Sequence, residues 1–314
     1  MRYGLPYKGS KNQIARWLVG NLPKAEIFVD LFFGGGAVTH AAMLSGKWKR
    51  FIANDIDGRL PKLFVECAYG MHTTANHTEW ISREEFHRLK DKDAYIALVW
   101  SFGNNGKDYI YGADIEEFKH AYHDAVFQDK PEYLKPWGYE IKSSHKIEPY
   151  DRYIEFNRQV KFQLPKMQLE NISRQIEIER LQSLQSLQSL QSLQSLQRLQ
   201  RLQSDYREVP IPDGALIYCD PPYKDTNCGK YDGFDCEAFY EWAAIQDNIY
   251  ISEYQMPDDF IPIANTDKIQ LSAANGNDYH VTEYLFTNKR TYNKMTKQQK
   301  ELIRLNNAEQ LTLF

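Results

Sequence analysis

The segment GALIYCDPPYKDTN, residues 214–227, constrains the fold of this chain more than any other stretch. Residues 215–219 form a continuous apolar run, the pattern of a strand buried on both faces of a parallel sheet. Pro221 stops the strand because proline has no N–H for the ladder, and Asp220, which precedes it, is held to extended backbone. The segment predicts a stiff turn at the carboxyl end of a strand, where open α/β sheets bind ligands. An ordinary strand end is the alternative interpretation.

Helix and strand patterns alternate at the start of the chain, as a parallel sheet requires. They predict a helix over residues 10–20, a buried strand over 26–33, a helix over 37–46 and a short strand over 51–55. A glycine-rich turn, residues 34–36, joins the first strand to the helix that follows it. The chain therefore opens as a βαβ unit.

The same alternation returns towards the end of the chain. After the strand at 215–219, the pattern predicts a helix over residues 236–246 and a strand over 248–254. TEYLFTNKR, residues 282–290, predicts a late strand that runs antiparallel to the others. The fold class that follows is α/β.

The pattern loosens between these two parts, so the α/β alternation brackets an insertion. We expect a discontinuous sheet domain built from residues 1–60 and 205–314, with a smaller domain inserted at residues 61–180. A Leu-Gln-Ser repeat at residues 181–204 connects the insertion to the second half of the sheet domain.

The repeat places leucine at every third position from Leu181 to Leu202. Each step of three residues turns an α-helix by about 300°, so these leucines form no fixed stripe. Only three residues per turn would align them, and long 3₁₀ helices are uncommon. We expect a helical spacer over residues 181–204, with a solenoid-like stack or a partly disordered tether as alternatives.

Composition limits the class of protein. Of the 314 residues, 42% are hydrophobic and 25% charged, as in soluble globular proteins, and no stretch approaches the roughly 18 apolar residues of a membrane span. The opening MRYGLPYKGSKNQ lacks the apolar core of a secretion signal. A net charge of −4 means that any DNA contact must use local positive charge. The four cysteines include no CxxC pair, which favours a reducing cytoplasm and argues against a zinc site.

Two further features could hold a ligand at the edge of the sheet. The glycines of residues 34–36 let a ligand approach a helix N-terminus, where free N–H groups favour anionic atoms. The dinucleotide fingerprint GxGxxG is not met, because Thr39 stands at its third glycine position. Asp55 ends the second strand, where a carboxylate can bind the two hydroxyls of a ribose. Taken singly, a tight turn and a turn-forming aspartate explain both features.

Taken together, these features resemble the Dam-like DNA adenine methyltransferases, which use S-adenosylmethionine (AdoMet). The matching pieces, in chain order, are YKGSKNQIA (7–15), FVDLFFGGGAV (28–38), IANDID (52–57), SFGNNGKDYIYG (101–112), CDPPY (219–223) and YISEYQMP (250–257). They cover both ends of the chain and skip most of its middle. The glycine motif precedes Asp-Pro-Pro-Tyr, as in that family, although the opening has YKGSK where some relatives have WAGGK. The resemblance implies a Rossmann-like methyltransferase sheet flanked by helices, with an inserted smaller DNA-recognition domain.

The resemblance assigns catalysis to Asp220, Pro221, Pro222 and Tyr223. Asp220 and the carbonyl of Pro221 would accept the two protons of the adenine amino group, which localises a lone pair that is otherwise delocalised into the ring. Asp220 would also meet the positive charge that develops on the nitrogen. The target adenine must leave the duplex, and Tyr223 would stack on it. No metal is needed.

The resemblance also implies which residues surround AdoMet. They are Tyr7, Lys11, Asp30, Gly34, Gly36, Asp55 and Asp220. Tyr7 would lie against the adenine of the cofactor, and Lys11 would reach towards the target base or its backbone. The aspartate and glycines of the first turn would shape the methionine end, and Asp55 would bind the ribose.

The DNA partner is expected to contact the inserted region. In the resembled family a hairpin like SFGNNGKDYIYG enters the DNA, so Asn105 and Lys107 are the expected contacts. Basic and aromatic residues interleave at residues 133–166, which suits phosphate contacts and stacking. A small solvated domain with an aromatic core explains that stretch equally well.

Other functions stay open on the residues alone. Cytosine-N4 methylation suits the same acceptor pair, as does methylation of RNA, whereas methylases of protein glutamine usually carry Asn-Pro-Pro-Tyr. An oxidoreductase leaves Asp-Pro-Pro-Tyr unexplained, and an inactive DNA-binding relative does not need the intact Asp220. We expect a monomer acting on double-stranded DNA in the cytoplasm of a prokaryotic or phage-infected cell. A cognate restriction endonuclease as partner stays open.

Overall fold

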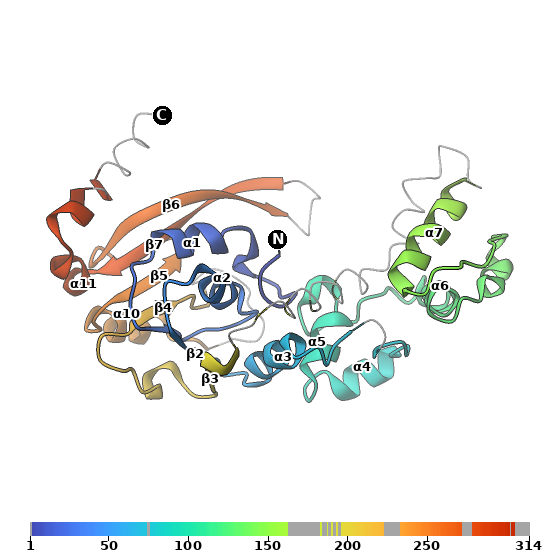
Figure 1. The fold of residues 1–314 in the computed structure, drawn as a ribbon, viewed down its shortest axis with the longest axis horizontal. Coiled ribbons are helices and arrows are strands. Elements are labelled where there is room, and N and C mark those ends of the chain that lie inside the picture. Colours follow the sequence, from blue (N-terminus) through green and yellow to red (C-terminus); the bar gives the residue numbers. More distant parts are fainter. Residues whose placement is uncertain are drawn as a thin grey trace. The chain divides into compact units, whose positions relative to one another are not determined.

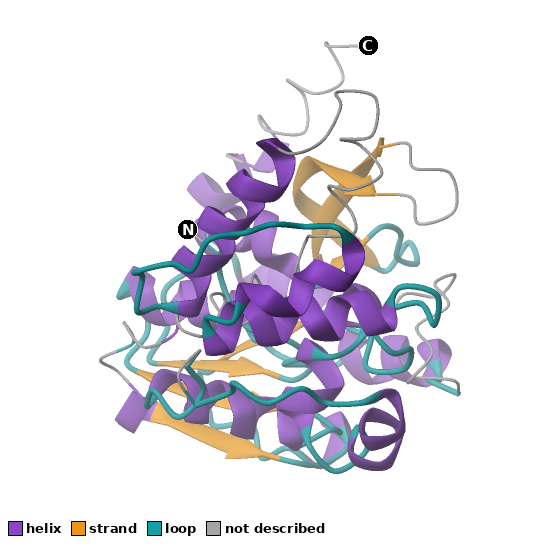
Figure 2. Ribbon diagram, turned by 90° about the vertical axis from the view of Figure 1, so that its right-hand side faces the viewer, coloured by secondary structure: helices purple, strands orange, loops and turns teal. Residues whose placement is uncertain are grey.

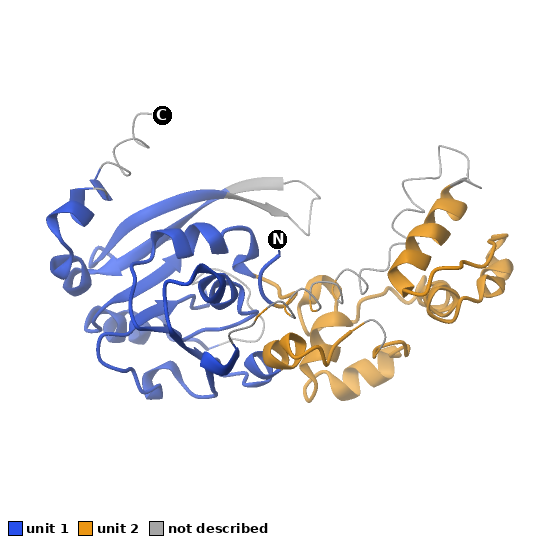
Figure 3. Ribbon diagram, viewed as in Figure 1, with its two compact units in different colours: residues 1–4, 10–62, 195–314 blue, residues 5–9, 63–194 orange. Residues whose placement is uncertain are grey.

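The structure is a computed structural model, and it has two compact units. It describes residues 2–73, 76–162, 183, 187, 190, 193, 196–222, 233–271, 278–301, 303 and 304. The first unit comprises residues 1–4, 10–62 and 195–314, and the second comprises residues 5–9 and 63–194 (Figure 3). That residues 61–180 form a DNA-recognition domain stays a prediction.

The first unit is built on a seven-stranded mixed sheet of described residues, in the order β3-β2-β1-β4-β5-β7-β6 (Figure 1). Its strands are β1 (Ile27–Asp30), β2 (Arg50–Asn54), β3 (Leu199–Leu202), β4 (Leu216–Cys219), β5 (Ile249–Glu253), β6 (Phe260–Leu271) and β7 (Asp278–Asn288). The first five strands pair in parallel, and β7 runs antiparallel to both β5 and β6. The predicted α/β class and the late antiparallel strand are confirmed.

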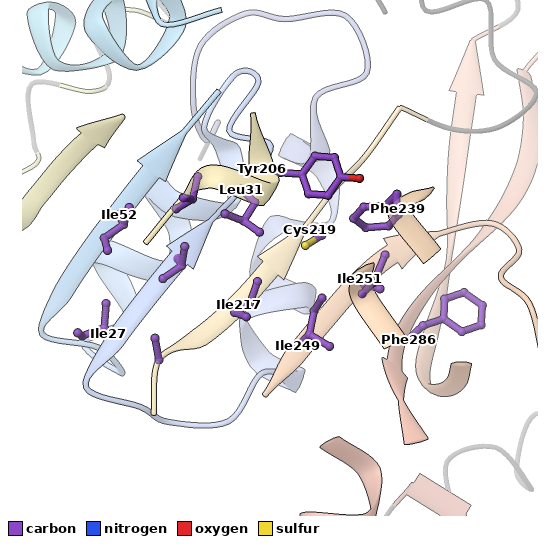
Figure 4. Close-up of a cluster of buried hydrophobic side chains, with 14 of the residues drawn as sticks. Ile27, Leu31, Ile52, Tyr206, Ile217, Cys219, Phe239, Ile249, Ile251 and Phe286 are labelled. Atoms are coloured by element: carbon purple, nitrogen blue, oxygen red, sulfur yellow. The ribbon is translucent and has the colours of Figure 1, made fainter. Parts of the chain in front are cut away.

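The parallel strands β1, β4 and β5 are buried throughout, and both faces of the sheet carry apolar side chains there. On one face, Val29, Ile217 and Ile251 belong to a cluster of buried residues that also includes Phe239 (Figure 4). On the other face, Phe28 of β1 stacks on Tyr218 of β4, with ring centroids 6.1 Å apart. Every residue of β1 and β4 is buried, which explains why these strands appear in the sequence as continuous apolar runs.

The described helices of the first unit are η1 (Lys11–Gln13), α1 (Ala15–Asn21), α2 (Ala37–Ser45), η6 (Leu196–Arg198), η7 (Tyr206–Glu208), α10 (Cys236–Ala244) and α11 (Lys289–Lys294). Of these, α2 and α10 confirm the helices predicted over residues 37–46 and 236–246, whereas α11 begins inside the strand predicted over residues 282–290. The helix expected over residues 10–20 is divided, because Ser10 caps a 3₁₀ turn and α1 begins only at Ala15. The Lys47 ammonium donates to three carbonyl groups at the end of α1, those of Val19, Gly20 and Leu22.

The end of the leucine repeat corrects one expectation. A helical spacer was expected over residues 181–204, but Leu199–Leu202 is the strand β3, paired in parallel with β2. The Asn54 amide fixes this edge by donating to the Ser204 carbonyl, and the Asn54 side-chain oxygen accepts from the Ser204 N–H. The edge of β2 offers backbone N–H and C=O groups for pairing. Leucine at every third position in the sequence does not indicate this pairing. Most of residues 181–195 lie outside the described residues; Leu187, Leu190 and Leu193 are buried.

The second unit is mainly helical in its described part (Figure 2). Its helices are the later part of α3 (Arg59–Ala68), α4 (Arg83–Leu89), α5 (Ala94–Val99), η2 (Phe102–Asn104), α6 (Glu116–Gln128), η3 (Pro131–Trp137) and α7 (Pro149–Phe162). A capping box formed by Ser82 and Glu85 starts α4. The Trp80 ring packs edge-on against Trp100 and stacks on Tyr111. In the part of the chain that the structure describes, no helix combines the length and apolar character needed to cross a membrane.

Candidate active site

The turn between β1 and α2 depends on its glycines. Gly34 and Gly36 have φ values of 50° and 68°, in the left-handed region that favours glycine. The Gly36 N–H donates to the Phe33 carbonyl at 2.7 Å, which closes the turn. A Cβ atom on Gly36 would lie 2.2 Å from the Phe33 ring, so the turn has no room for a side chain there. Gly36 is buried at the start of α2, with the Phe33 ring beside it.

Asp55 ties this turn to the strand beside it. Its carboxylate accepts the Gly34 N–H at 2.7 Å and the Asp57 N–H at 2.9 Å, and the residue is buried. The Phe33 N–H also donates to the Asn54 carbonyl at 2.9 Å, so both segments are held by their backbones. The structure thus brings Gly34 and Asp55 together, at the carboxyl ends of β1 and β2.

Asp30 is a buried carboxyl group at the end of β1. The Thr39 hydroxyl donates to its Oδ2 atom at 2.6 Å, whereas its buried Oδ1 atom has no hydrogen-bond partner among the described residues. Burial raises the pKa of Asp30 to about 7; the hydrogen bond from Thr39 acts in the opposite direction, and the charges of Asp220 and Asp55 add to the rise. A hydrogen-bond donor or a cation beside Oδ1 would give this buried oxygen a partner.

Asp220 directly follows β4, in the Asp-Pro-Pro-Tyr turn. Its Oδ1 atom lies 2.7 Å from the Lys11 ammonium and accepts from the Ser252 hydroxyl at 3.4 Å. The Ser252 hydroxyl shares a second hydrogen bond of 2.7 Å with the buried Tyr218 hydroxyl. Asp220 keeps 21% of its side chain exposed, against 5% for Lys11, so the carboxylate is the part of this pair that reaches solvent.

Lys11 lies between two carboxylates. Besides Asp220, its ammonium is 3.7 Å from Oε1 of Glu283, a residue of β7 whose side chain is fully buried. Burial alone would lower the pKa of Lys11, but the charges of Asp220 and Glu283 outweigh it and raise that pKa above its ordinary value. The side chain is therefore a buried cation at neutral pH.

A third carboxyl group, that of Glu253, ends β5 beside this pair. It is buried, and its Oε1 atom accepts the Tyr254 N–H at 2.8 Å. Burial raises the pKa of Glu253 to about 8; the hydrogen bond from Tyr254 lowers it, and the charge of Asp220 raises it further. Glu253 is therefore mainly protonated at neutral pH.

The remaining residues expected at this site are distributed as follows. Pro221 is buried and Pro222 half-buried, directly after the strand β4. Tyr223 lies outside the described residues. Tyr7 is half-buried and belongs to residues 5–9 of the second unit.

Asn105 and Lys107 lie on a closed loop of the second unit. An antiparallel bridge between Ser101 and Tyr109 closes the loop, as the hairpin prediction implies. The Asn105 side-chain oxygen accepts the Lys107 N–H at 2.8 Å, and its amide group donates to Asp108 at 2.8 Å. Asn105 thus builds the turn, while the Lys107 side chain is exposed.

Sequence reasoning missed several residues of the site. Ser252 and Glu253 lie in the quoted segment YISEYQMP but received no role, although a polar pair that ends an apolar strand resembles the pattern of Asp220. No sequence pattern indicated a role for Glu283, because it lies inside β7 and does not end a strand. The strand β7 is the antiparallel neighbour of β5. Only the folded sheet places the Glu283 carboxylate beside Lys11.

A comparison with protein families was made. The model of a protein family described as D12 class N6 adenine-specific DNA methyltransferase matches residues 7–255. This range includes the glycine turn, Asp55 and the Asp220 turn. No curated protein sequence matches the chain.

Proposed function

Because the chain belongs to the D12 class of N6 adenine-specific DNA methyltransferases, we propose that it methylates an adenine flipped out of duplex DNA. The methyl group of AdoMet is transferred to the exocyclic amino nitrogen of that adenine. The observation that carries this proposal is the partly exposed carboxyl group of Asp220, which lies 2.7 Å from the Lys11 ammonium at the carboxyl end of β4. It lies in the same sheet as the glycine turn and Asp55.

The residues around the glycine turn fit AdoMet. When bound, AdoMet supplies an electrophilic methyl group on its sulfonium sulfur. The buried Oδ1 atom of Asp30, which has no donor among the described residues, suits the ammonium group at the methionine end. The left-handed conformation of Gly34 and Gly36 gives the turn that connects Asp30 to α2 its tight path. Asp55 is the proposed ribose ligand, because its carboxylate, which accepts the Gly34 and Asp57 N–H groups, directly follows β2 beside the glycine turn.

Asp220 and Pro221 are the proposed acceptors for the amino group of the base. The adenine nitrogen is a weak nucleophile because its lone pair is delocalised into the ring. Two acceptors on its hydrogens favour a pyramidal nitrogen, and Pro221, which lacks a competing N–H, offers its carbonyl for one of them. As the N–C bond would form, the bond from the methyl group to sulfur would break, and the neutral thioether S-adenosylhomocysteine would leave. The nitrogen would become positive, and the carboxylate of Asp220 would stabilise that charge in a preorganised setting. The nitrogen would then lose one proton, and Asp220 is the proposed base that accepts it.

DNA contacts are proposed for the second unit and for Tyr223 of the catalytic turn. Tyr223 would stack on the flipped base, since base–aromatic stacking is independent of hydrogen-bond pattern. Lys107, whose side chain is exposed, is a proposed phosphate contact, and Asn105 shapes the loop that presents it. Because the chain carries a net charge of −4, such local cations must supply the attraction to DNA.

Incubation with labelled AdoMet and unmethylated duplex DNA, followed by analysis of the modified base, tests the proposal. N6-methyladenine is the expected product. N4-methylcytosine, or no transfer by a folded protein that binds AdoMet, would contradict it. Sequencing of methylated sites on a plasmid exposed to the protein would then give the recognition sequence.

A further inference from the structure

Glu283 is a buried carboxylate that the mechanism above does not use. It lies on β7, its side chain is fully buried, and its Oε1 atom is 3.7 Å from the Lys11 ammonium. Burying a carboxylate is costly unless a cation or donors compensate for the lost water. Lys11 provides such a cation, and the same ammonium contacts Asp220 at 2.7 Å. One buried lysine therefore serves two carboxylates.

The charges of these three residues do not cancel. Lys11 and Asp220 alone would form a neutral pair, which is a weak stabiliser of positive charge developing on a base. With Glu283 ionised beside Lys11, the three groups carry one net negative charge. Glu253 adds none at neutral pH, since burial raises its pKa to about 8. In a water-poor site, one uncompensated charge has a large effect on a developing cation.

The two distances also suggest how Asp220 can change partners. Lys11 donates to the Oδ1 atom of Asp220, and this contact weakens that carboxylate as an acceptor for an amino group. A shift of the ammonium by about 1 Å towards Glu283 would reach ordinary hydrogen-bond distance there, because the present separation is 3.7 Å. The lysine would keep a buried counter-ion throughout, and Asp220 would be released to the base.

We propose that Glu283 is a positioning residue for methyl transfer, which acts by sharing the Lys11 ammonium with Asp220. It keeps one net negative charge in the group and offers the lysine a second partner when the base arrives. Glu283 does not contact the base in this scheme. The inference rests on the proposed role of Asp220 as acceptor.

The test is a comparison of Glu283→Gln with wild type in single-turnover methylation at saturating AdoMet and duplex DNA. The expected result is a rate at least tenfold lower, with the Kd for AdoMet changed less than twofold. The acidic limb of the rate–pH profile should move to lower pH, because a negative charge that favours protonation of the neighbouring carboxylates is removed. A rate and a pH profile equal to those of wild type would overturn the inference.

A matched control separates this effect from damage to the strand. Thr287, also on β7 and fully buried, donates to the Ile249 carbonyl at 2.7 Å and has no role in the proposed chemistry. Thr287→Val should lower thermal stability but leave the rate within twofold of wild type. If Glu283→Gln does not fold, Glu283→Asp keeps the charge and should retain a rate closer to wild type than the rate of Lys11→Met; a rate as low as that of Lys11→Met would overturn the inference.

One readout is independent of methylation. The charge of Glu283 contributes to the raised pKa of Glu253, so ¹³C NMR titration should show that pKa falling in Glu283→Gln. A wild type that produces no N6-methyladenine would defeat the proposed function whatever this titration shows. A wild type that methylates adenine, with an unchanged Glu253 titration and an unchanged rate in Glu283→Gln, would defeat only the inference about Glu283.

Discussion

The Lys11 ammonium lies 2.7 Å from Oδ1 of Asp220, although the two residues come from segments far apart in the chain. Lys11 opens the 3₁₀ turn before α1, and Asp220 follows the central strand β4. Their contact joins the opening motif to the Asp-Pro-Pro-Tyr turn within one sheet unit. Much of the chemistry proposed for this protein depends on that pair.

Neutralising Asp220 should remove most of the methyl transfer. Asp220→Asn keeps an acceptor oxygen but loses the charge that stabilises the positive nitrogen, so kcat is expected to fall about 10²–10³-fold. The Kd for AdoMet, measured by calorimetry, should change far less. Asp213→Asn, an exposed change in the turn before β4, is the control and should retain wild-type kcat. Substantial turnover by Asp220→Asn would refute the acceptor role.

Removing the cation should destabilise the fold as well as the activity. Lys11→Met leaves the carboxylates of Asp220 and Glu283 without their shared partner, which is expected to lower the free energy of unfolding by about 3 kcal/mol. Lys49→Met breaks an exposed pair with Glu26 and should change stability little. Urea unfolding of both variants measures the difference. Equal stability of the two variants would mean that the buried pair contributes no more than the exposed one.

Stability should fall as pH rises through the range in which Glu253 ionises. Its pKa is raised from 4.5 to about 8 in the folded state, so between these values the folded protein binds more protons than the unfolded chain. The free energy of unfolding contributed by this group is therefore highest below pH 4.5 and lowest above pH 8. Asp30, with its pKa raised to about 7, acts in the same direction.

Glu253→Gln isolates the contribution of Glu253 to this pH dependence. The variant should show a flatter fall in the free energy of unfolding between pH 5 and 8 than wild type, in urea titrations at a series of pH values. Identical slopes for the two proteins would show that Glu253 titrates normally.

The glycine turn should tolerate no side chain at Gly36. Gly36→Ala forces a left-handed residue and places Cβ against the Phe33 ring, which should cost about 1–3 kcal/mol of stability and weaken AdoMet binding. Gly20→Ala is the matched control, because a Cβ there meets no atom within 4 Å and the residue lies in α1. That change should be neutral or stabilising. Thermal melts and AdoMet titration of both variants make the comparison, and equal behaviour would contradict the structural role of Gly36.

Lys107 should contribute to DNA affinity without contributing to chemistry. Lys107→Ala removes one exposed cation, so binding should weaken for all DNA sequences. The slope of the logarithm of the binding constant against the logarithm of salt concentration should fall in magnitude by about one. Single-turnover rates at saturating DNA should stay at the wild-type value. An unchanged salt slope would show that Lys107 does not contact phosphate.

Much of the sheet could be predicted because most of its strands are runs of apolar residues that are visible in the local sequence. The apolar runs before Asp30 and Asp220 predict buried parallel strands, and β1 and β4 are buried throughout. The strand β3 could not be predicted in this way. It takes its conformation from the open edge of β2, and leucine at every third position gives no alternation to recognise.

Some residues of the candidate site could be predicted from the sequence, and others could not. Asp55 and Asp220 were recognisable because each ends an apolar strand, and carboxyl ends of parallel strands meet at one edge of a sheet. Asp30 lies inside the predicted strand 26–33, and only the family resemblance indicated a role for it. Glu283 was not recognisable, because nothing near it in the chain indicates a buried cation. Lys11 reaches it only across the folded sheet.

By itself, the sequence determined the α/β class, the order of its turns and the acidic residues that end its strands, since these depend on neighbours along the chain. Only the tertiary structure decided that Lys11 lies between Asp220 and Glu283 and that the repeat ends as an edge strand. Both outcomes depend on groups that meet across space, where burial makes an unpaired charge or an open strand edge costly.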